Sequence, residues 1–355
     1  AGGSAGGAAV CVASLSAPLA ICTDALGSVV SSSHFCGVFG LRFSPASIPL
    51  SSFVSKGHLN GLPLSCGLLS AHPDGLAFLS DALQPNPPPC TALPSTLVSE
   101  VATGVVSSVR VGVYKADCLF APFKSCADAL DTAIARAKAA GIEVVECDCP
   151  VSYPLMLVCY SVFGADGGEL YSELLNGQQV AANLEDQLMV MGMSPLLRFA
   201  FKTLLMAVGA ERIADVVSMF CAQSVRTYLE RIEELDQMKQ DLLTSMNEKN
   251  IHFFLCPAFP IPAPPADLAG KVDAANSHNR AFSAMGFPTV TLPMALAKED
   301  VSESREVADF WDTAVAEAEA EAEGLPVGVQ LVGVPGSDRL CLQLARLIAT
   351  PTSAV

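Results

Sequence analysis

Residues 109–114 read VRVGVY, residues 127–140 read ADALDTAIARAKAA and residues 142–146 read IEVVE, and these three stretches decide the fold class. The first and third are short runs rich in β-branched residues, which favour strands, whereas the second has the Ala-rich composition of a helix. A strand, a helix and a second strand in succession predict a βαβ unit, whose strands lie parallel in a sheet covered by helices. The sequence therefore predicts an α/β protein.

Further elements lie on both sides of this unit. Residues 8–13 are small and apolar, which suits a helix that follows a Gly-rich loop. Residues 210–246 space apolar side chains along one face of a long helix, with at most one break. Four more short apolar runs are candidates for buried strands, namely Leu19–Thr23, Ile251–Cys256, Thr289–Leu292 and Val327–Val332. We expect a single large domain from these 355 residues.

The composition excludes several classes of function. A hydrophobic content of 51% with 16% charged residues indicates a folded, enzyme-sized body. The formal net charge of −16 argues against nucleic acid as a partner, because such binding depends on Lys and Arg that neutralise phosphates. The 13 cysteines stand singly, apart from Cys147 and Cys149, which is typical of reduced thiols inside a cell. The five histidines show no metal-ligand spacing, so we expect no metal.

Two serines stand in loops suited to acyl transfer. Ser4 lies in the Gly-rich stretch GGSAGG, and Ser28 follows Gly27 where the candidate strand 19–23 turns. A serine hydroxyl is a weak nucleophile unless a base accepts its proton, and the reaction also needs N–H donors at the developing oxyanion. Glycine permits the backbone angles that bring consecutive N–H groups together. A Gly- and Ser-rich loop is also the composition of a flexible linker, so composition alone leaves both interpretations open.

The motifs around these serines occur together and in order: GGSAGGAA at 2–9, TDALGS at 23–28 and HFCGVFGLR at 34–42. This set resembles the signature of the amidase signature hydrolases, with the two serines in the family's register. Residues 252–264, 281–293 and 324–348 are similar to the family's later strands and last helix. The resemblance implies one amidase signature domain over residues 1–355, with a large, mixed, mostly parallel central sheet wrapped by helices and no cofactor or metal.

The resemblance also implies roles for particular residues. The serine matching Ser28 is the acyl-accepting nucleophile in the family. The serine matching Ser4 follows a cis peptide bond and relays a proton to a lysine, which must be neutral to act as the base. The backbone N–H groups of Ala25, Leu26, Gly27 and Ser28 match the loop that binds the oxyanion. The family's lysine lies several tens of residues before the first serine loop. We therefore expect this chain to be an N-terminally truncated domain that begins after the position of that lysine.

Three positions depart from the family's pattern. Ala5 replaces a common second serine, Leu26 a common glycine and Val30 a common arginine. If the position of Leu26 requires a left-handed backbone, the leucine costs about 1 to 2 kcal/mol there. These departures support a second hypothesis, in which the fold is retained as a binding or interaction scaffold with impaired catalysis.

Within the family the chain resembles fatty-acid amide hydrolases through VRVGVY, residues 163–177 and residues 307–318. Those enzymes hydrolyse lipid amides and lie on membrane surfaces through an apolar helical cap, which corresponds here to residues 187–220. A helix over 191–210 reaches about 30 Å. Arg198 and Lys202 would cost about 5 to 7 kcal/mol at the bilayer centre, more than the apolar side chains return, so spanning is disfavoured. We expect one helical face to lie on the membrane, formed by Leu197, Phe201, Leu204, Leu205 and Val208.

An apolar helical face is also common in a protein core, so a pair of core-packing helices is an equal alternative for residues 187–220. A third hypothesis for function is the glutamine-amide-hydrolysing subunit of an amidotransferase, which shares the serine motifs without a reason for an apolar cap. The expected partners are a small lipid amide and a membrane surface, with a homodimer suggested by the resemblance. The expected location is intracellular, on the surface of an internal membrane.

Overall fold

The structure is a computed structural model that describes residues 2–50, 58–85, 87, 89–116, 119–180, 182–298 and 309–349. The strands are β1 (Leu19–Asp24), β2 (Phe39–Arg42), β3 (His58–Leu59), β4 (Leu62–Pro63), β5 (Ser65–Ser70), β6 (Arg110–Val113), β7 (Glu143–Glu146), β8 (Phe253–Pro257), β9 (Thr289–Leu296) and β10 (Pro326–Gly333). The helices are α1 (Gly6–Ala13), α2 (Ser28–Cys36), α3 (Pro73–Leu83), α4 (Ser95–Ala102), α5 (Lys124–Ala139), α6 (Tyr153–Phe163), α7 (Glu169–Leu175), α8 (Ala182–Met191), α9 (Pro195–Ala207), α10 (Glu211–Met219), α11 (Val225–Glu248), the 3₁₀ turn η1 (Asp273–Asn276), α12 (Ser277–Ala284), α13 (Phe310–Ala320) and α14 (Asp338–Ala349).

Eight of the described strands form one sheet in the order β1-β5-β2-β9-β10-β8-β6-β7. β6 is parallel to β7 and to β8, and α5 connects β6 with β7, so the βαβ unit predicted from the sequence is confirmed. The other neighbouring pairs are antiparallel. The mixed sheet is thus confirmed, but mostly parallel pairing is wrong for the described strands. A parallel pair joined directly in sequence needs a crossover helix, and β6-α5-β7 is the unit that supplies one here.

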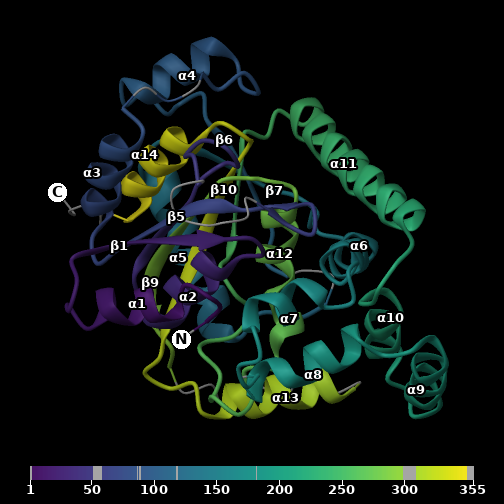
Figure 1. The fold of residues 1–355 in the computed structure, drawn as a ribbon. Helices are drawn as coiled ribbons and strands as arrows, with labels where there is room; N and C mark the ends of the chain where they lie inside the picture. Colours follow the sequence, from purple (N-terminus) through teal and green to yellow (C-terminus); the bar gives the residue numbers. More distant parts are fainter. Residues whose placement is uncertain are drawn as a thin grey trace.

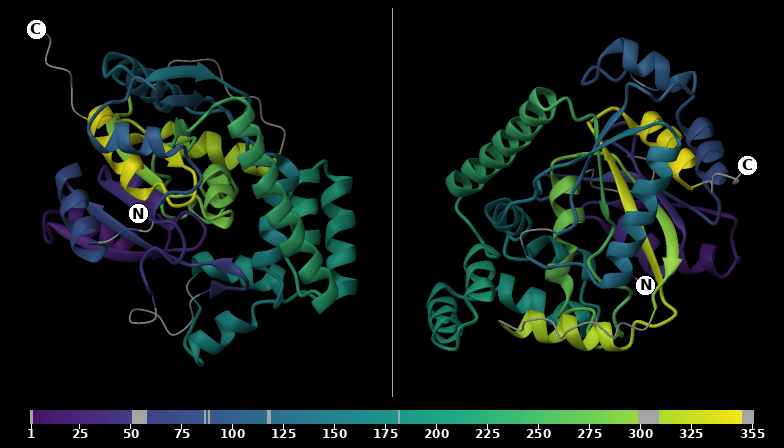
Figure 2. Two further views of the ribbon diagram at one scale, coloured as in Figure 1. Left: turned by 90° about the horizontal axis from the view of Figure 1, so that it is seen from above. Right: turned by 180° about the vertical axis from the view of Figure 1, so that it is seen from behind.

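Helices cover both faces of this sheet (Figure 1). α5 and α14 pack on its central strands on the face that the rear view of Figure 2 shows. On the opposite face α2 packs against β2, β9 and β10, and α12 lies beside α2 and α6. This arrangement buries the central strands on both faces, which explains why β5, β8 and most of β10 consist of buried residues.

A small satellite core lies under the N-terminal helix. It contains Ala5, Ala9 and Val12 of the first segment, together with Val29, Val38 and Leu69. The residue after Ser4 and the residue after Ser28 are therefore buried in the same cluster. Packing of α1 against α2 fixes the two serine loops relative to each other.

The apolar segment 187–220 does not form the long helix expected over 191–210. It breaks after Met191, begins again at Pro195 and breaks once more before Glu211, giving α8, α9 and α10. Ser194 caps α9, with its side chain accepting from the N–H of Leu197, and Pro195 occupies the first turn, where the missing N–H costs nothing. In the described ranges no single helix is long and apolar enough to cross a membrane, and α8 and α9 meet that test only as a pair bent by 117°.

Candidate active site

The loop that carries Ser28 connects the edge strand β1 to helix α2. β1 ends at Asp24, and α2 begins at Ser28 itself. Gly27 precedes the helix in the left-handed region, with φ 93°. A Cβ atom at Gly27 would also lie 2.3 Å from Cβ of Asn279, so both the backbone angle and the close approach of α12 require glycine. Ser28 is thus held at the positive end of a helix dipole, where a developing negative charge is stabilised.

Asp24 holds this loop from inside. One carboxylate oxygen, Oδ1, accepts from the N–H of Gly27 at 2.8 Å, and Oδ2 accepts from the N–H of Val29 at 2.7 Å. Arg42 donates from Nε to Asp24 Oδ1 at 3.1 Å, and both side chains are fully buried. The guanidinium also donates to the carbonyl oxygens of Phe287 and Ser283, at 3.0 and 2.8 Å. Burial lowers the pKa of Arg42 and Asp24 opposes this, but an arginine remains charged in proteins.

The two serines meet at the surface end of this loop. Ser4 Oγ donates to Ser28 Oγ across 3.2 Å, and Ser28 Oγ donates to the carbonyl oxygen of Thr23 at 3.0 Å. Ser4 is exposed and Ser28 is half-buried. Gly3 permits the approach, since a Cβ there would lie 2.8 Å from Cβ of Ser28. A hydroxyl hydrogen rotates freely, so the same oxygen positions also allow Ser28 to donate to Ser4, as a proton relay requires.

The predicted oxyanion loop retains three of its four N–H donors. The N–H of Gly27 donates to Asp24, so it is not available to an oxyanion as the sequence predicts. The N–H groups of Ala25, Leu26 and Ser28 have no hydrogen-bond acceptor among the described residues. Three free donors around Ser28 are an arrangement that can bind an oxyanion.

The departures noted in the sequence have local structural consequences. Leu26 is not among the described residues with positive φ, so the left-handed cost considered for it does not arise; Gly27 supplies that conformation. Val30 is 1% exposed and packs in the interior, and Ala5 belongs to the satellite core.

The cis bond implied by the resemblance is absent from this structure. All described peptide bonds, including that between Gly3 and Ser4, are trans. A cis bond between non-proline residues costs about 3 to 4 kcal/mol and persists only where its surroundings enforce it, whereas Ser4 lies in an exposed loop. No lysine among the described residues hydrogen-bonds to Ser4 or Ser28.

Helix α12 closes the other side of the loop. Asn276 Nδ2 donates to the carbonyl oxygen of Leu26 at 2.9 Å, and Asn279 Nδ2 donates to the carbonyl oxygen of Ala258 and to Asn276 Oδ1, each at 2.8 Å. The Leu26–Gly27 peptide unit is therefore held at both ends, with its carbonyl bound to Asn276 and its N–H bound to Asp24. The loop is therefore braced by Asp24 below and by two asparagines beside it.

A buried histidine ties α2 to the rest of the molecule. His34 Nε2 lies 3.0 Å from the carbonyl oxygen of Ile261, and Nδ1 accepts from the N–H of Gly328 at 3.1 Å. A neutral ring with its hydrogen on Nε2 satisfies both partners, whereas a second hydrogen on Nδ1 would oppose the N–H of Gly328. Burial lowers the pKa of His34 to about 4. This histidine therefore supports α2 as a neutral group.

Three hollows in the surface lie elsewhere, between α3, α4 and α14, between α6 and α11, and beside Gln84, Pro87 and Cys90. None of the three is lined by Ser4 or Ser28. The described residues contain no group of three His, Cys, Asp or Glu side chains that could hold a metal ion.

Comparison with known proteins decides the family. The family model described as Amidase matches residues 1–342. The chain belongs to the Amidase family. It is 27% identical to the fatty-acid amide hydrolase 1 of Sus scrofa over 367 residues, which covers 97% of this chain and 61% of that protein. It is 28% identical to a glutamyl-tRNA(Gln) amidotransferase subunit of Thermus thermophilus over 219 residues, covering 59% of this chain and 45% of that one.

The fold is that of the family as well. A solved fatty acid amide hydrolase structure superposes with a TM-score of 0.71 at 18% identity, covering 98% of this chain and 58% of that one. The α/β amidase signature fold expected from the sequence is thus confirmed. The chain spans about three fifths of the length of the fatty-acid amide hydrolase 1 that it matches.

The sequence motifs identify the serines but not the groups that hold them. Asp24 lies within the motif TDALGS and Arg42 within HFCGVFGLR, but the motifs alone assign no role to either residue. The N-cap rule does not single out Asp24, because the N-cap of α2 is Gly27 and Asp24 stands three residues earlier, at the end of β1. No local signal identifies Arg42 or Asn276, because the carbonyl oxygens of Phe287 and Leu26 that they bind lie 245 and 250 positions away.

Proposed function

We propose that the protein hydrolyses carboxylic amides, with Ser28 as nucleophile and Ser4 as the proton relay. The observation that carries the proposal is the 3.2 Å contact between the two hydroxyl oxygens at the start of α2, beside three N–H groups that have no acceptor in the described structure. The family membership supports the reaction class.

In the proposed mechanism, Ser28 Oγ attacks the amide carbonyl while its proton passes to Ser4 Oγ. Ser4 passes its own proton to the base, which in this proposal is the neutral lysine that the resemblance implies ahead of the first serine loop. The tetrahedral oxyanion accepts hydrogen bonds from the N–H groups of Ala25, Leu26 and Ser28. The proton returns through Ser4 to the leaving amine as the C–N bond breaks, and water then cleaves the acyl-enzyme by the reverse relay.

The substrate class in this proposal is the fatty-acid amides. It is supported by the similarity to a protein named for that activity and by the apolar surface of α9. The similarity to an amidotransferase subunit provides the contrasting case. Release of ammonia from glutamine without turnover of any fatty amide would favour that class instead.

We further propose that α9 lies on a lipid surface. No residue of α9 is buried, and its apolar side chains are exposed at Leu196, Leu197, Phe199, Leu204 and Met206, as is Val208 at its end. Phe201 and Leu205, which the sequence placed on the same face, are only partly exposed. The charged residues of α9 are Arg198 and Lys202, so a cationic helix stands on a protein of net charge −16, as binding to anionic lipid requires.

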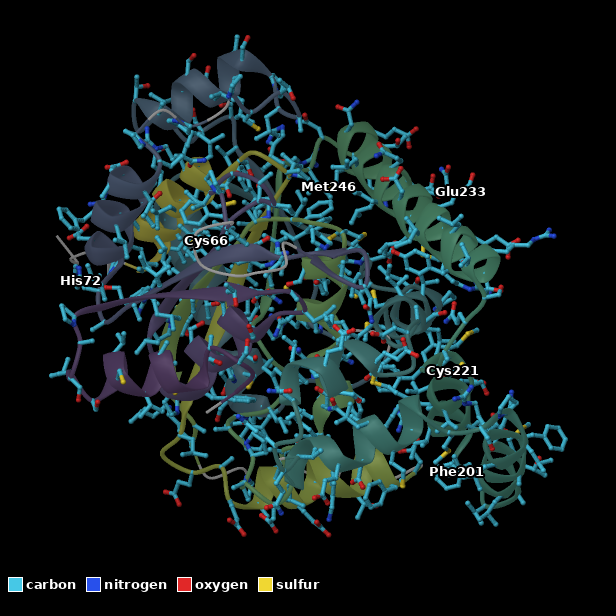
Figure 3. All side chains as sticks on the ribbon, in the orientation of Figure 1. Cys66, His72, Phe201, Cys221, Glu233 and Met246 are labelled. Carbon is cyan, nitrogen blue, oxygen red and sulfur yellow. The ribbon has the colours of Figure 1, made fainter. Side chains whose placement is uncertain are left out.

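The position of α9 suits this role. It lies at the outer corner of the molecule, away from the central sheet, in both the front and rear views (Figures 1 and 2). Figure 3 labels Phe201 at this corner.

The hydrolase proposal is tested by labelling the native protein with a fluorophosphonate probe and mapping the modified peptide. We expect the label on Ser28, its loss in Ser28→Ala, and a strongly slowed reaction in Ser4→Ala. Ser99→Ala, which changes an exposed serine of α4, is the matched control and should label normally. A folded protein that takes no label would favour the non-catalytic scaffold.

The lipid proposal is tested by sedimentation with vesicles of phosphatidylcholine and phosphatidylserine. Phe199→Asp should reduce the bound fraction, whereas Phe78→Asp should not, although the two phenylalanines are 70% and 68% exposed. Phe78 is the matched control because it lies on α3, away from the corner that carries α9. Equal binding of the two variants would contradict the assignment of α9.

A further inference from the structure

Helix α12 carries a buried charge whose hydrogen bonds are incomplete. The side chain of Arg280 is 5% exposed; its Nη2 donates to Asp273 Oδ2 at 2.7 Å, and the guanidinium lies 4.4 Å from the centre of the Tyr160 ring. Its Nε and Nη1 have no acceptor in the described structure. Buried polar groups are nearly always paired, because leaving a buried donor unbound costs free energy.

The same short helix holds further unpaired polar atoms. Asn279 Nδ2 is fully used by two acceptors, while Asn279 Oδ1 has no donor among the described residues. Ser277 Oγ is likewise without a partner in the described structure. Three residues of one helical turn thus present both unbound donors and an unbound acceptor.

This turn lies against the nucleophile loop. Asn276 contacts the carbonyl of Leu26, and Asn279 packs against Gly27. Arg280 follows Asn276 by four positions, so the two side chains project from one helical face. Asn279 therefore stands beside Ser28's loop, and the guanidinium of Arg280, the next residue, lies between Asp273 and the Tyr160 ring of α6.

The chemistry of these atoms selects their ligand. Arg280 and Asp273 neutralise each other, so a carboxylate would add a second negative charge beside Asp273. An alkyl chain would leave every one of these atoms unpaired. A neutral group that both accepts and donates satisfies them, with its carbonyl oxygen bound by Arg280 and its N–H bound by Asn279 Oδ1. A carboxamide has this character.

We propose that Arg280 and Asn279 form a subsite for a second amide group of the substrate, so that the preferred substrates are N-acylated amino-acid amides and related diamides. The inference rests on the proposed amidase function and deepens it. Asp273, whose side chain is 37% exposed, marks the side from which the second amide enters.

The experiment compares matched substrates that differ in the second amide. N-Decanoylglycinamide carries it on the amine side and N-butyldecanamide lacks it; N-hexylglutaramide carries it on the acyl side and N-hexylpentanamide lacks it. We expect wild-type kcat/KM to favour the diamide of at least one pair by about 10- to 100-fold, the usual strength of hydrogen bonds to a charged donor. Arg280→Met should abolish the preference, and Arg280→Lys should retain part of it.

The controls separate this inference from the proposed function. Arg226→Met, on the exposed face of α11, should keep the preference. Calorimetry on Ser28→Ala measures binding of each diamide without turnover, and the rate of fluorophosphonate labelling reports whether the Arg280 variants keep a folded nucleophile. Equal kcat/KM within both pairs, or a preference unchanged in a folded Arg280→Met, overturns the subsite while leaving the amidase proposal intact. Absence of labelling at Ser28 in the wild type overturns the amidase proposal itself.

Discussion

Substitution of Arg42 by methionine tests whether the buried ion pair fixes the nucleophile loop. The change leaves the carboxylate of Asp24 buried without its cationic partner, and it removes the donors for the carbonyl oxygens of Phe287 and Ser283. Breaking a buried pair by removing one partner costs about 3 to 5 kcal/mol. Because folded domains are stable by only about 5 to 15 kcal/mol, the variant should lose a large part of its stability.

The assay is urea denaturation followed by far-UV circular dichroism and by the fluorescence of Trp311, which is the single tryptophan of the chain. In the Arg42→Met background, Asp24→Asn removes the unpaired charge and keeps an acceptor for one N–H, so it should restore about 1 kcal/mol or more. The control Arg226→Met breaks an exposed pair and should change stability by less than about 1 kcal/mol.

The fluorophosphonate reaction provides the functional readout, at a urea concentration where each variant is still folded. Displacement of the N–H groups of Gly27 and Val29 should slow labelling of Ser28 in Arg42→Met. A loss of stability below about 1 kcal/mol, or a double variant less stable than Arg42→Met, would refute the reasoning.

Three further predictions follow from the site and its supports. Gly27→Ala places a Cβ at a residue with φ 93° and 2.3 Å from a side-chain atom of Asn279 in α12, so it should lower stability by more than about 1 kcal/mol and abolish labelling of Ser28. The control Gly7→Ala lies in helix α1 with open space around it and should stabilise the protein slightly. Similar effects of the two variants on stability would contradict the packing described for Gly27. Burial lowers the pKa of His34 to about 4, so between pH 4 and 6.5 the native state binds fewer protons at this residue than the unfolded chain does. The stability contributed by neutral His34 is therefore complete above pH 6.5 and falls by about 3 kcal/mol as the pH is lowered towards 4. His34→Gln should flatten this part of the measured curve of unfolding free energy against pH. Iodoacetamide should modify the exposed Cys11 of the native protein and not the buried Cys159, whose pKa burial raises to about 12. Peptide mapping measures both reactions, and modification of Cys159 as fast as that of Cys11 would contradict the described burial.

Local sequence patterns predicted the parts of the fold that depend on neighbours along the chain. The βαβ unit, helix α1 and strands β8, β9 and β10 were expected from apolar runs of the right length, and the structure contains all of them. The pairing of the sheet was not predictable in this way. β2 lies between β5 and β9, and the antiparallel direction of such pairs depends on contacts between segments far apart in sequence.

The apolar segment shows a different limit. Residues 191–210 have the composition of one helix, but Gly192 and Pro195 separate it into α8 and α9. Proline fits only the first turn of a helix without loss of a hydrogen bond, so the break at this position could have been recognised. The sequence does not show which apolar face of α9 is covered, because the partial burial of Phe201 and Leu205 depends on the tertiary arrangement.

The candidate site divides in the same way. The serines and the glycines around them were found because their motifs are contiguous, and the structure brings Ser4 and Ser28 within hydrogen-bond distance. Arg42 and Asn276, the last residue of η1, hold these motifs through contacts that span 245 and 250 positions. Their identities carry no local pattern that distinguishes them from other polar residues.

These long contacts also set when the site can form during synthesis. Asn276 and the carbonyl of Phe287 emerge from the ribosome some 250 residues after Leu26 and Arg42, which they contact. At ordinary translation rates the interval is on the order of 10 to 50 s. During this interval Asp24 and Arg42 cannot be buried as they are in the complete fold. A nascent chain that stops before α12 would therefore carry both serines without an organised oxyanion loop. The candidate site is therefore completed only after α12 and Phe287 have been made, long after Ser4 and Ser28.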